Sequence, residues 1–578
     1  MKSRRAILQG IRHLFELSKK RYSEMIFLFI IICLNGLIEI IGLSLIHPVI
    51  AIATGQNQIT QSDIPFANLI FKITTLSSNN FNEVCIFLII CLISGIACSI
   101  YLIYCGSSLA SKLRNDWTKS LFSQTLYAPY YSILKDGTGS TIETISVETR
   151  EAGRVVVSAV KLLQSGILSI FLFIGLFVSN FYPTILFLSI SFFVFLSLNY
   201  LGFLKSIQRG IKMVNYNQSV SSIITEAILN IKQIKLFNGY KEYKLKLKNQ
   251  LEEFKKTKVK FDISNQLPGI LIKYIVVIFG VASLMYLYSI NRNYLLNSLP
   301  RLSLLVVLAA RLSNVISILS AQTMKFNMGL AIIESIYIKM NNKDPIENLH
   351  EGYEIKKINK IEFENVSFAW PNINNNIINK INLNFERGIT IIKGESGIGK
   401  STVGSLILGI LKPNNGIIKI NNKELQFYNL TTVRNTISLV TQEYELFRGS
   451  IIENIKFGNQ NATYSDVIKA AKKACAHEFI ESMPLGYETI IGDLGKNLSG
   501  GQKQRLALAR ALIKKSSVYI FDEVTNALDP FTEELVQKTI NELGKKHIVI
   551  QISHLNTFPK NVNKIYAFKK NGIKLIKV

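Results

Sequence analysis

The sequence is poor in the residues that build covalent or metal-held scaffolds. Its 578 residues include only 6 cysteines, 6 histidines and 2 tryptophans. No CxxC pair occurs, and five of the cysteines lie in or beside apolar runs, where a thiol serves as a small hydrophobe. We therefore expect neither a disulfide framework nor a cysteine–histidine metal centre. The first apolar run has no small-residue cleavage site after it, so we expect it to stay as a helix and not to be removed as a signal peptide.

Acidic residues are also scarce. The chain has 39 Asp and Glu against 66 Lys and Arg, which gives a formal net charge of +27. Such an excess can indicate nucleic-acid binding, but here the basic residues do not gather with aromatic residues on one soluble module. Many of them lie between apolar runs, where membrane topology accounts for them. We therefore expect no nucleic-acid partner.

Long, nearly uncharged apolar runs fill the first part of the chain. Each can cross a hydrocarbon core of about 30 Å as a helix. The six runs are 23–53, 84–106, 159–179, 182–204, 267–290 and 299–322. The segments 1–22, 107–158 and 205–266 are rich in Lys and Arg, which predicts a cytoplasmic N-terminus. The sequence thus predicts an all-α membrane domain of six helices that cross the lipid bilayer. Some of these helices continue into the cytoplasm.

Composition changes sharply in the second part of the chain. We predict a transmembrane domain over 1–340, a polar linker over 341–358 and a soluble α/β domain over 359–578. In the soluble domain, 381–385 and 388–392 predict two strands joined by a turn. The predicted fold class is therefore a multi-domain membrane protein with an all-α membrane part and an α/β P-loop part.

A glycine-rich loop follows these strands and opens a helix. It fits GxxxxGK[ST] in the strand–loop–helix setting in which backbone N–H groups converge on phosphate oxygens. Lys400 is expected to reach the β and γ phosphates of a nucleotide, and Ser401 to ligate Mg²⁺. The predicted phosphate-binding residues are Gly394, Glu395, Ser396, Gly397, Ile398, Gly399, Lys400, Ser401 and Thr402.

An apolar strand that ends in two carboxylates supplies the second part of this chemistry. The apolar residues 518–521 precede Asp522 and Glu523. We expect Asp522 to hold Mg²⁺ and Glu523 to polarise the water that attacks the γ-phosphate. Many strands end in acids, so this prediction depends on its pairing with Lys400.

The segment Leu498-Ser-Gly-Gly-Gln502 resembles the signature of ATP-binding cassette (ABC) transporters, and residues 360–578 resemble their nucleotide-binding domain along nearly their whole length. The resemblance implies that Trp370 stacks on adenine. It also implies that Gln442 senses Mg²⁺ and the membrane domain, and that His554 contacts the γ-phosphate.

The resemblance further implies ATP and Mg²⁺ as cofactors and a pair of chains that meet head to tail, most simply a homodimer. Asn526 stands where the family usually has Ser. The other residues that the resemblance assigns to the nucleotide are Ser499, Gly500, Gly501, Gln502 and Asp529. The implied Mg²⁺ ligands are Ser401, Gln442 and Asp522, and the implied catalytic residues are Glu523, His554 and Gln442.

A membrane domain followed by a nucleotide-binding domain in one chain resembles exporters and flippases. The segment 489–495 resembles the part that exporters place against the cytoplasmic tips of the membrane domain, with Asp493 in place of the usual Glu. The implied function is ATP-driven export or flipping across a bacterial cytoplasmic membrane, with the N-terminus and the nucleotide-binding domain in the cytoplasm.

Two ionisable residues inside predicted spans bear on the substrate. Glu39 precedes Pro48 in the first span and Arg311 lies in the sixth, a pattern similar to half-transporters that flip lipid-linked oligosaccharides. Ionisable groups in spans usually face a cavity or a partner. Either Arg311 meets an anionic pyrophosphate lipid or a peptide carboxylate while Glu39 balances it, or the two form a structural pair. We interpret Pro48 as a kink, and Lys273 as an interfacial anchor, although the flippase pattern would place an acid in that span.

Other functions remain open at this stage. The main alternative substrate is a ribosomally made peptide of the bacteriocin kind, and a lipid or drug is a third. Outside transport, the alternative is a membrane-anchored ATPase that drives a regulatory partner.

Overall fold

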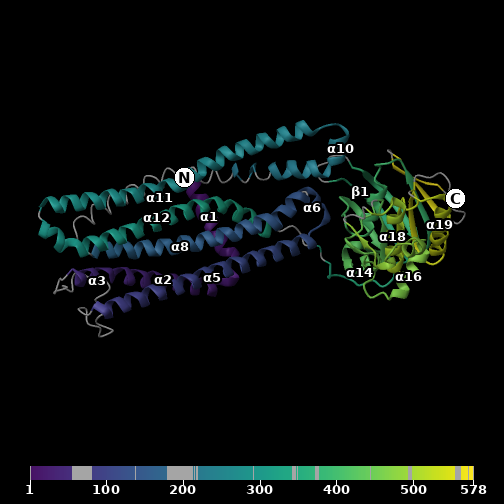
Figure 1. Cartoon of the computed structure of the whole chain (residues 1–578). Helices are drawn as coiled ribbons and strands as arrows, with labels where there is room; N and C mark the ends of the chain where they lie inside the picture. Colours follow the sequence, from purple (N-terminus) through teal and green to yellow (C-terminus); the bar gives the residue numbers. More distant parts are fainter. Residues whose placement is uncertain are drawn as a thin grey trace. The chain divides into compact units, whose positions relative to one another are not determined.

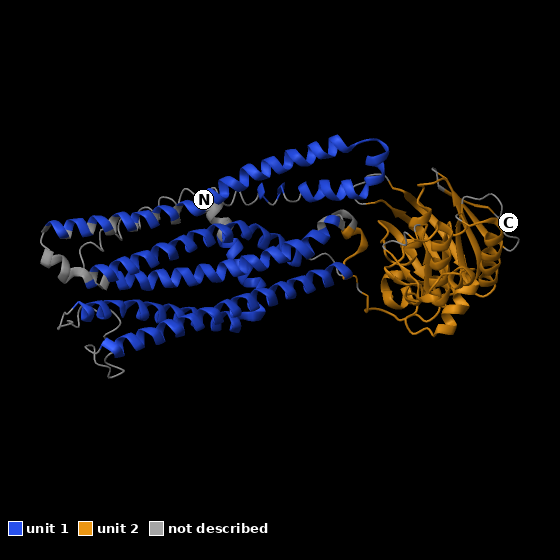
Figure 2. Ribbon diagram, viewed as in Figure 1, with its two compact units in different colours: residues 1–126, 137–343 blue, residues 127–136, 344–578 orange. Residues whose placement is uncertain are grey.

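A computed structural model describes most of the chain. The chain is divided into two compact units (Figure 1, Figure 2). One unit comprises residues 1–126 and 137–343, and the other comprises 127–136 and 344–578. The described residues are 2–54, 81–136, 138–178, 212–213, 215–216, 219–290, 292–341, 347, 349–370, 376–442, 444–492, 497–526, 528–553, 562–569 and 572–576.

The first unit is helical throughout its described part. Long helices run side by side along it, and α12 packs against both α8 and α11 (Figure 1). Its helices are α1 (Lys2–Leu17), a 3-10 turn (Lys19–Arg21), α2 (Tyr22–Ser44), α3 (Ile46–Ala53), α5 (Phe81–Tyr127), α7 (Thr138–Glu143), a π-helical turn (Thr144–Glu148), α8 (Thr149–Val178), α10 (Ile231–Leu236), α11 (Tyr240–Ile290) and α12 (Arg292–Asn341).

Four helical stretches in the described residues are long and apolar enough to cross a bilayer. They are Lys19–Ala53, Phe81–Tyr127, Thr141–Leu176 and Leu302–Asn341. They coincide with the first, second, third and sixth predicted spans. The fifth, 267–290, forms the C-terminal part of α11, and the fourth, 182–204, lies outside the described residues.

The first span is a helix in two parts, and Pro48 explains the break. Proline has no N–H to donate to the carbonyl of Ser44, four residues earlier, and its ring crowds that carbonyl. Accordingly α2 ends at Ser44 and α3 begins at Ile46, while the Leu45 N–H still donates to the Ile41 carbonyl at 3.3 Å. The described helix is thus interrupted at Leu45, three residues before the Pro48 that the sequence predicts to kink the span.

The helix α5 has one apolar face that is exposed in the described part of its unit. Seven isoleucines on it are each more than half exposed: Ile86, Ile89, Ile90, Ile93, Ile96, Ile100 and Ile103. The opposite face buries Leu102, Leu109 and Trp117, whose indole N–H donates to the Leu17 carbonyl at 3.2 Å. Seven large apolar side chains in contact with water would be unfavourable, so this face is suited to lipid.

The second unit is built on two β-sheets with helices packed around them. A four-stranded antiparallel sheet has the order β2-β1-β4-β5, and a six-stranded sheet has the order β12-β11-β3-β10-β9-β6. The strands are β1 (Lys360–Phe368), β2 (Ile378–Glu386), β3 (Gly388–Gly394), β4 (Asn415–Ile420), β5 (Lys423–Glu424), β6 (Ile437–Val440), β9 (Val518–Asp522), β10 (Ile548–Ser553), β11 (Val562–Lys569) and β12 (Gly572–Ile576), with a small pair β7 (Gly449–Ser450) and β8 (Ile490–Ile491).

The helices of this unit begin with α6, a short piece at the tip of the long α5–α8 connection. The Glu347 N–H donates to the Tyr127 carbonyl at 2.9 Å, and Glu347 forms an ion pair with Arg434 at 2.7 Å. The helices are α6 (Tyr130–Asp136), α13 (Lys400–Ile407), a 3-10 turn (Leu425–Phe427), α14 (Leu430–Thr436), α15 (Ile451–Lys456), α16 (Tyr464–Lys473), α17 (His477–Glu481), a second 3-10 turn (Gly486–Glu488), α18 (Gly500–Ile513) and α19 (Pro530–Gly544).

The central strands of the larger sheet, β9 and β10, are buried on both faces, which explains their nearly continuous apolar sequences. Side chains alternate between the two faces with a period of two. In β9, Val518 and Ile520 join the core with α13, whereas Tyr519 and Phe521 join the core with α18. Strands β11, β3, β10, β9 and β6 run parallel, so their carboxyl ends meet at one edge. Ligands of open α/β sheets bind at that edge.

Candidate functional site

The glycine-rich loop lies between the end of β3 and the start of α13, as the sequence predicts. Gly397 and Gly399 have φ angles of +79° and +95°, in the left-handed region that favours glycine. A Cβ on Gly399 would lie 2.7 Å from the Cγ2 atom of Ile377. This close approach of backbone to side chain requires glycine at position 399, and it fixes the loop at the N-terminus of α13.

Lys400 is the first residue of α13, and its charge is buried inside the loop. Its Nζ donates to the carbonyls of Gly394 at 2.6 Å and of Glu395 at 2.9 Å, and the residue is only 5% exposed. Burial lowers the pKa of Lys400, while the charges of Glu523 and Asp522 act in the opposite direction. An anionic ligand would replace the two carbonyls as a stronger partner for this ammonium group.

Strand register brings the two carboxylates to the same edge as the loop. In β10, Ile552 pairs with Ile392 of β3 on one side and with Asp522 of β9 on the other. Asp522 is therefore separated from the phosphate loop by a single strand. Val440, the last residue of β6, pairs with Phe521, so Gln442 emerges beside the carboxylates. Four strand ends thus converge on one small region.

Glu523 follows β9 immediately and is held in an unusual conformation. Its φ angle is +53°, which a non-glycine residue adopts only where the surroundings compensate. Its carboxylate atom Oε2 accepts hydrogen bonds from Gln442 Nε2 at 2.9 Å and from Asn526 Nδ2 at 2.8 Å. The residue is only 8% exposed, and these two hydrogen bonds fix the orientation of its buried side chain.

Two further residues, which no sequence motif indicates, hold the backbone of Glu523. The Glu523 carbonyl accepts hydrogen bonds from the Tyr444 hydroxyl at 3.3 Å and from Gln504 Nε2 at 3.4 Å. Burial, with Glu523 and Asp522 nearby, raises the pKa of Tyr444 to about 12, so its hydroxyl stays protonated and can donate. Tyr444 lies two residues after Gln442, a proximity that could have drawn attention to it. Gln504 shows no such signal beyond its place in α18.

The predicted signature residues form the start of α18. The Ser499 hydroxyl caps the helix by accepting from the Gln502 N–H at 3.3 Å, and the Gln502 side chain accepts from the Ser499 N–H at 2.9 Å. Gly500 and Gly501 occupy the first turn. Asp529 has a similar local role, because its carboxylate caps α19 through the Thr532 N–H at 3.0 Å, and these bonds lower its pKa.

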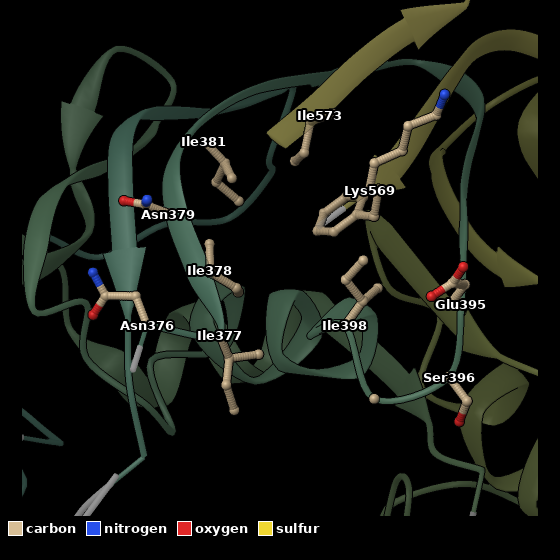
Figure 3. Close-up of a pocket in the computed structure, with 12 residues that line it drawn as sticks. Asn376, Ile377, Ile378, Asn379, Ile381, Glu395, Ser396, Ile398, Lys569 and Ile573 are labelled. Atoms are coloured by element: carbon tan, nitrogen blue, oxygen red, sulfur yellow. The ribbon is translucent and has the colours of Figure 1, made fainter. Parts of the chain in front are cut away.

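A cavity of about 310 Å³ lies next to the phosphate loop (Figure 3). Among the predicted nucleotide residues, its lining includes Glu395, Ser396, Gly397 and Ile398. Figure 3 shows isoleucine side chains from β2, the loop and β12 directed into it, with Asn376 and Asn379 on one side and Glu395 and Ser396 on the other. The cavity therefore has an apolar floor and a polar rim.

The resemblance also assigned roles to Trp370 and His554. Trp370 is half-buried and packs edge to face on Phe368, with ring centroids 5.5 Å apart. His554 follows the last residue of β10 and lies outside the described residues, as does Asp493.

The predicted Mg²⁺ ligands fit that metal by the chemistry of their donor atoms. Ser401, Gln442 and Asp522 offer a hydroxyl, an amide carbonyl and a carboxylate, all hard oxygen donors. Mg²⁺ usually binds through one or two protein carboxylates plus phosphate oxygens and water. In the part of the chain that is described, no cluster of three or more His, Cys, Asp or Glu side chains occurs that would hold a metal by itself.

In the membrane unit, the two ionisable residues singled out from the sequence meet. Arg311 Nε of α12 donates to Glu39 Oε1 of α2, and the two side chains are 38% and 19% exposed. Leu308 and Leu312, which flank Arg311 on α12, are fully buried, so the pair lies beside an apolar core. Lys273 is exposed on α11.

Comparisons with known proteins agree with this architecture. The ABC transporter transmembrane region family matches residues 25–299, and the ABC transporter family matches residues 378–526. An ABC transporter B family member 4 of Dictyostelium discoideum is 38% identical over 253 residues, 43% of this chain and 32% of that protein. An ABC transporter B family member 14 of Arabidopsis thaliana is 44% identical over 215 residues, 37% of this chain and 17% of that protein. The chain therefore matches less than a third of the length of these relatives.

A solved structure of a bacterial Atm1-family ABC exporter with ATP bound superposes with a TM-score of 0.75 at 19% identity, over 96% of this chain and 95% of that one. A helical membrane unit and a P-loop unit in one chain, each matched by its own family, define the class. The chain belongs to the ABC transporter family. It is an integral membrane protein with an ATP-binding domain, and its fold is that of the Atm1-type exporters.

Proposed function

We propose that this protein hydrolyses ATP to export or flip a substrate across a membrane, and that it works as a homodimer. The observation that carries the proposal is the convergence of Lys400, Asp522 and Glu523 at the carboxyl edge of one parallel sheet. At this edge lie the loop that would bind phosphate, the Asp522 carboxylate that would bind the metal, and the Glu523 carboxylate that can accept a proton.

The residues of the chain divide the chemistry among them. The loop N–H groups and Lys400 hold the phosphates. Asp522, Ser401 and Gln442 would hold Mg²⁺, which when bound neutralises phosphate charge. Glu523 accepts a proton from water as the water oxygen bonds to the γ-phosphorus, and the bond to ADP breaks.

A second copy completes the site in this proposal. The signature residues Ser499, Gly500 and Gly501 cap the ATP held by the partner's loop, because the N-terminus of α18 favours an anion. The basic cytoplasmic segments support an orientation with the N-terminus and the ATP-binding domain inside a bacterial cytoplasmic membrane. ATP then closes the dimer, and hydrolysis reopens it.

For the substrate we propose a lipid-linked oligosaccharide or another amphipathic anion. The bonded pair Glu39–Arg311 supports this, because a phosphate group would compete with the Glu39 carboxylate for the guanidinium, and a guanidinium can bind a phosphate through two parallel N–H bonds. Pairing with Glu39 keeps Arg311 neutralised between transport events, since an unpaired charge in a span is costly.

The test is ATP hydrolysis by the purified protein in lipid nanodiscs, with lipid-linked glycans, peptides and amphipathic drugs added in turn. We expect stimulation by the pyrophosphate-linked class and loss of that stimulation in Arg311→Ala, with the basal rate retained. Lys325→Ala, which removes an exposed cation from the same helix, is the matched control and should respond as the wild type does. Stimulation by peptides alone, or stimulation that survives Arg311→Ala, would contradict the substrate proposal.

A further inference from the structure

Two side-chain donors to Glu523, Gln442 and Asn526, use the same carboxylate oxygen. Gln442 Nε2 and Asn526 Nδ2 lie 2.9 and 2.8 Å from Oε2. The two donors come from different places: Gln442 from the segment after β6, and Asn526 from the turn that Glu523 itself begins. If one of these segments moves, the carboxylate can lose the hydrogen bond from that segment and keep the one from the other.

The Gln442 side chain has a second proposed role besides its bond to Glu523. It is a proposed ligand of Mg²⁺ through its amide oxygen, and the same planar amide carries the N–H that reaches Glu523. A turn of this amide toward the metal weakens its bond to the carboxylate. Gln442 is thus a poor permanent support for Glu523 during hydrolysis.

Asn526 is tied to Glu523 more directly. Its backbone N–H donates to the Glu523 carbonyl at 3.4 Å, and its side chain to the carboxylate, so both ends of one short turn are joined. A serine at this position would place its hydroxyl one bond from Cβ, whereas Nδ2 of asparagine lies two bonds away. The usual residue of the family could not make this contact with the same backbone.

We propose that Asn526 is a positioning residue that keeps the Glu523 carboxylate aimed when Gln442 turns to the metal. This inference rests on the proposed ATPase function. It assigns to Asn526 no contact with ATP. Its removal therefore lowers the rate of the chemical step and leaves nucleotide affinity unchanged.

The first measurement is steady-state ATP hydrolysis by the full-length protein in nanodiscs. Asn526→Ala should lower kcat about tenfold, which corresponds to about 1.4 kcal/mol, with KM for ATP within about twofold of the wild type. Asn526→Asp is nearly isosteric but puts a second carboxylate against Glu523, so it should lower kcat further. Asn461→Ala, at an exposed position outside the site, should change neither constant.

These two variants test whether the Asn526 amide is needed to aim the carboxylate. Wild-type kcat in Asn526→Asp would show that Glu523 works without a donor at this position, and that result overturns the inference. Wild-type kcat in Asn526→Ala overturns it as well. Absence of hydrolysis by the wild-type protein would instead contradict the proposed function itself, so the two failures are distinguishable.

A second measurement uses the nucleotide-free protein. Thermal unfolding of Glu523→Ala, Asn526→Ala and the double variant gives a double-mutant cycle for the contact. We expect the two changes to be non-additive, because either one alone removes the same hydrogen bond. Additive shifts of the unfolding temperature would show that the two side chains do not interact, and would overturn the inference.

Discussion

At the scale of single residues, the site depends on one buried cation and one oriented carboxylate. Lys400 donates to two carbonyls of its own loop, and Glu523 accepts from two amides. Both side chains are almost fully buried, where electrostatic interactions are stronger than in water. In the function that we propose, the two residues have separate roles: Lys400 binds the phosphates, and Glu523 acts on water.

Two substitutions test this separation. Glu523→Gln keeps the shape of the side chain but cannot accept a proton, so it should bind ATP with wild-type affinity and hydrolyse it at least about a hundredfold more slowly. Lys400→Ala should instead weaken ATP binding. Equilibrium binding of a fluorescent ATP analogue and single-turnover hydrolysis measure the two effects. Wild-type turnover in Glu523→Gln, or unchanged affinity in Lys400→Ala, would show that the roles are assigned wrongly.

At the scale of elements, the sequence predicted what depends on local pattern. The strands at 381–385 and 388–392 are confirmed as parts of β2 and β3, and the loop motif indicated Lys400 because its spacing is set within one strand–loop–helix unit. The contacts of Tyr444 and Gln504 with Glu523 were missed. They depend on the register of α18 against β9 and on the left-handed turn at Glu523, which no local pattern specifies.

The N-terminus of α16 gives a prediction about pH. Asp466 accepts hydrogen bonds from the Thr463 hydroxyl at 2.8 Å and the Thr463 N–H at 3.2 Å, and it pairs with Lys515. These interactions lower the pKa of Asp466 from 3.8 to about 2. Because the folded pKa lies below the unfolded value, the stabilisation is present above about pH 4 and is lost as the pH falls toward 2.

Asp466→Asn should therefore lower the unfolding temperature at pH 7, and the difference from the wild type should shrink toward zero near pH 2. Heat unfolding of the detergent-solubilised protein, followed by circular dichroism across this range, measures it. Lys469→Gln, an exposed change on the same helix, serves as the control. A difference that is independent of pH would rule out the carboxylate as its cause.

At the scale of the whole molecule, two units with different solvents share one chain. The membrane unit has a helix face of exposed isoleucines, and the second unit buries a parallel sheet on both faces. The described part of one chain contains both the phosphate loop, at the N-terminus of α13, and the signature residues, at the N-terminus of α18. We propose that each ATP lies between the loop of one copy and the signature of another.

Mixing two inactive variants tests whether the ATP sites are shared in this way. Lys400→Ala disables the loop, and Gly500→Asp places a negative charge at the start of α18, where it suits the helix but repels phosphate. Each variant alone should be inactive. If sites are shared head to tail, a mixed dimer has one intact site, and random mixing should restore up to about one quarter of wild-type ATPase activity. No recovery on mixing, with mixed dimers verified by differential tags, would contradict a shared site and place each ATP within a single chain.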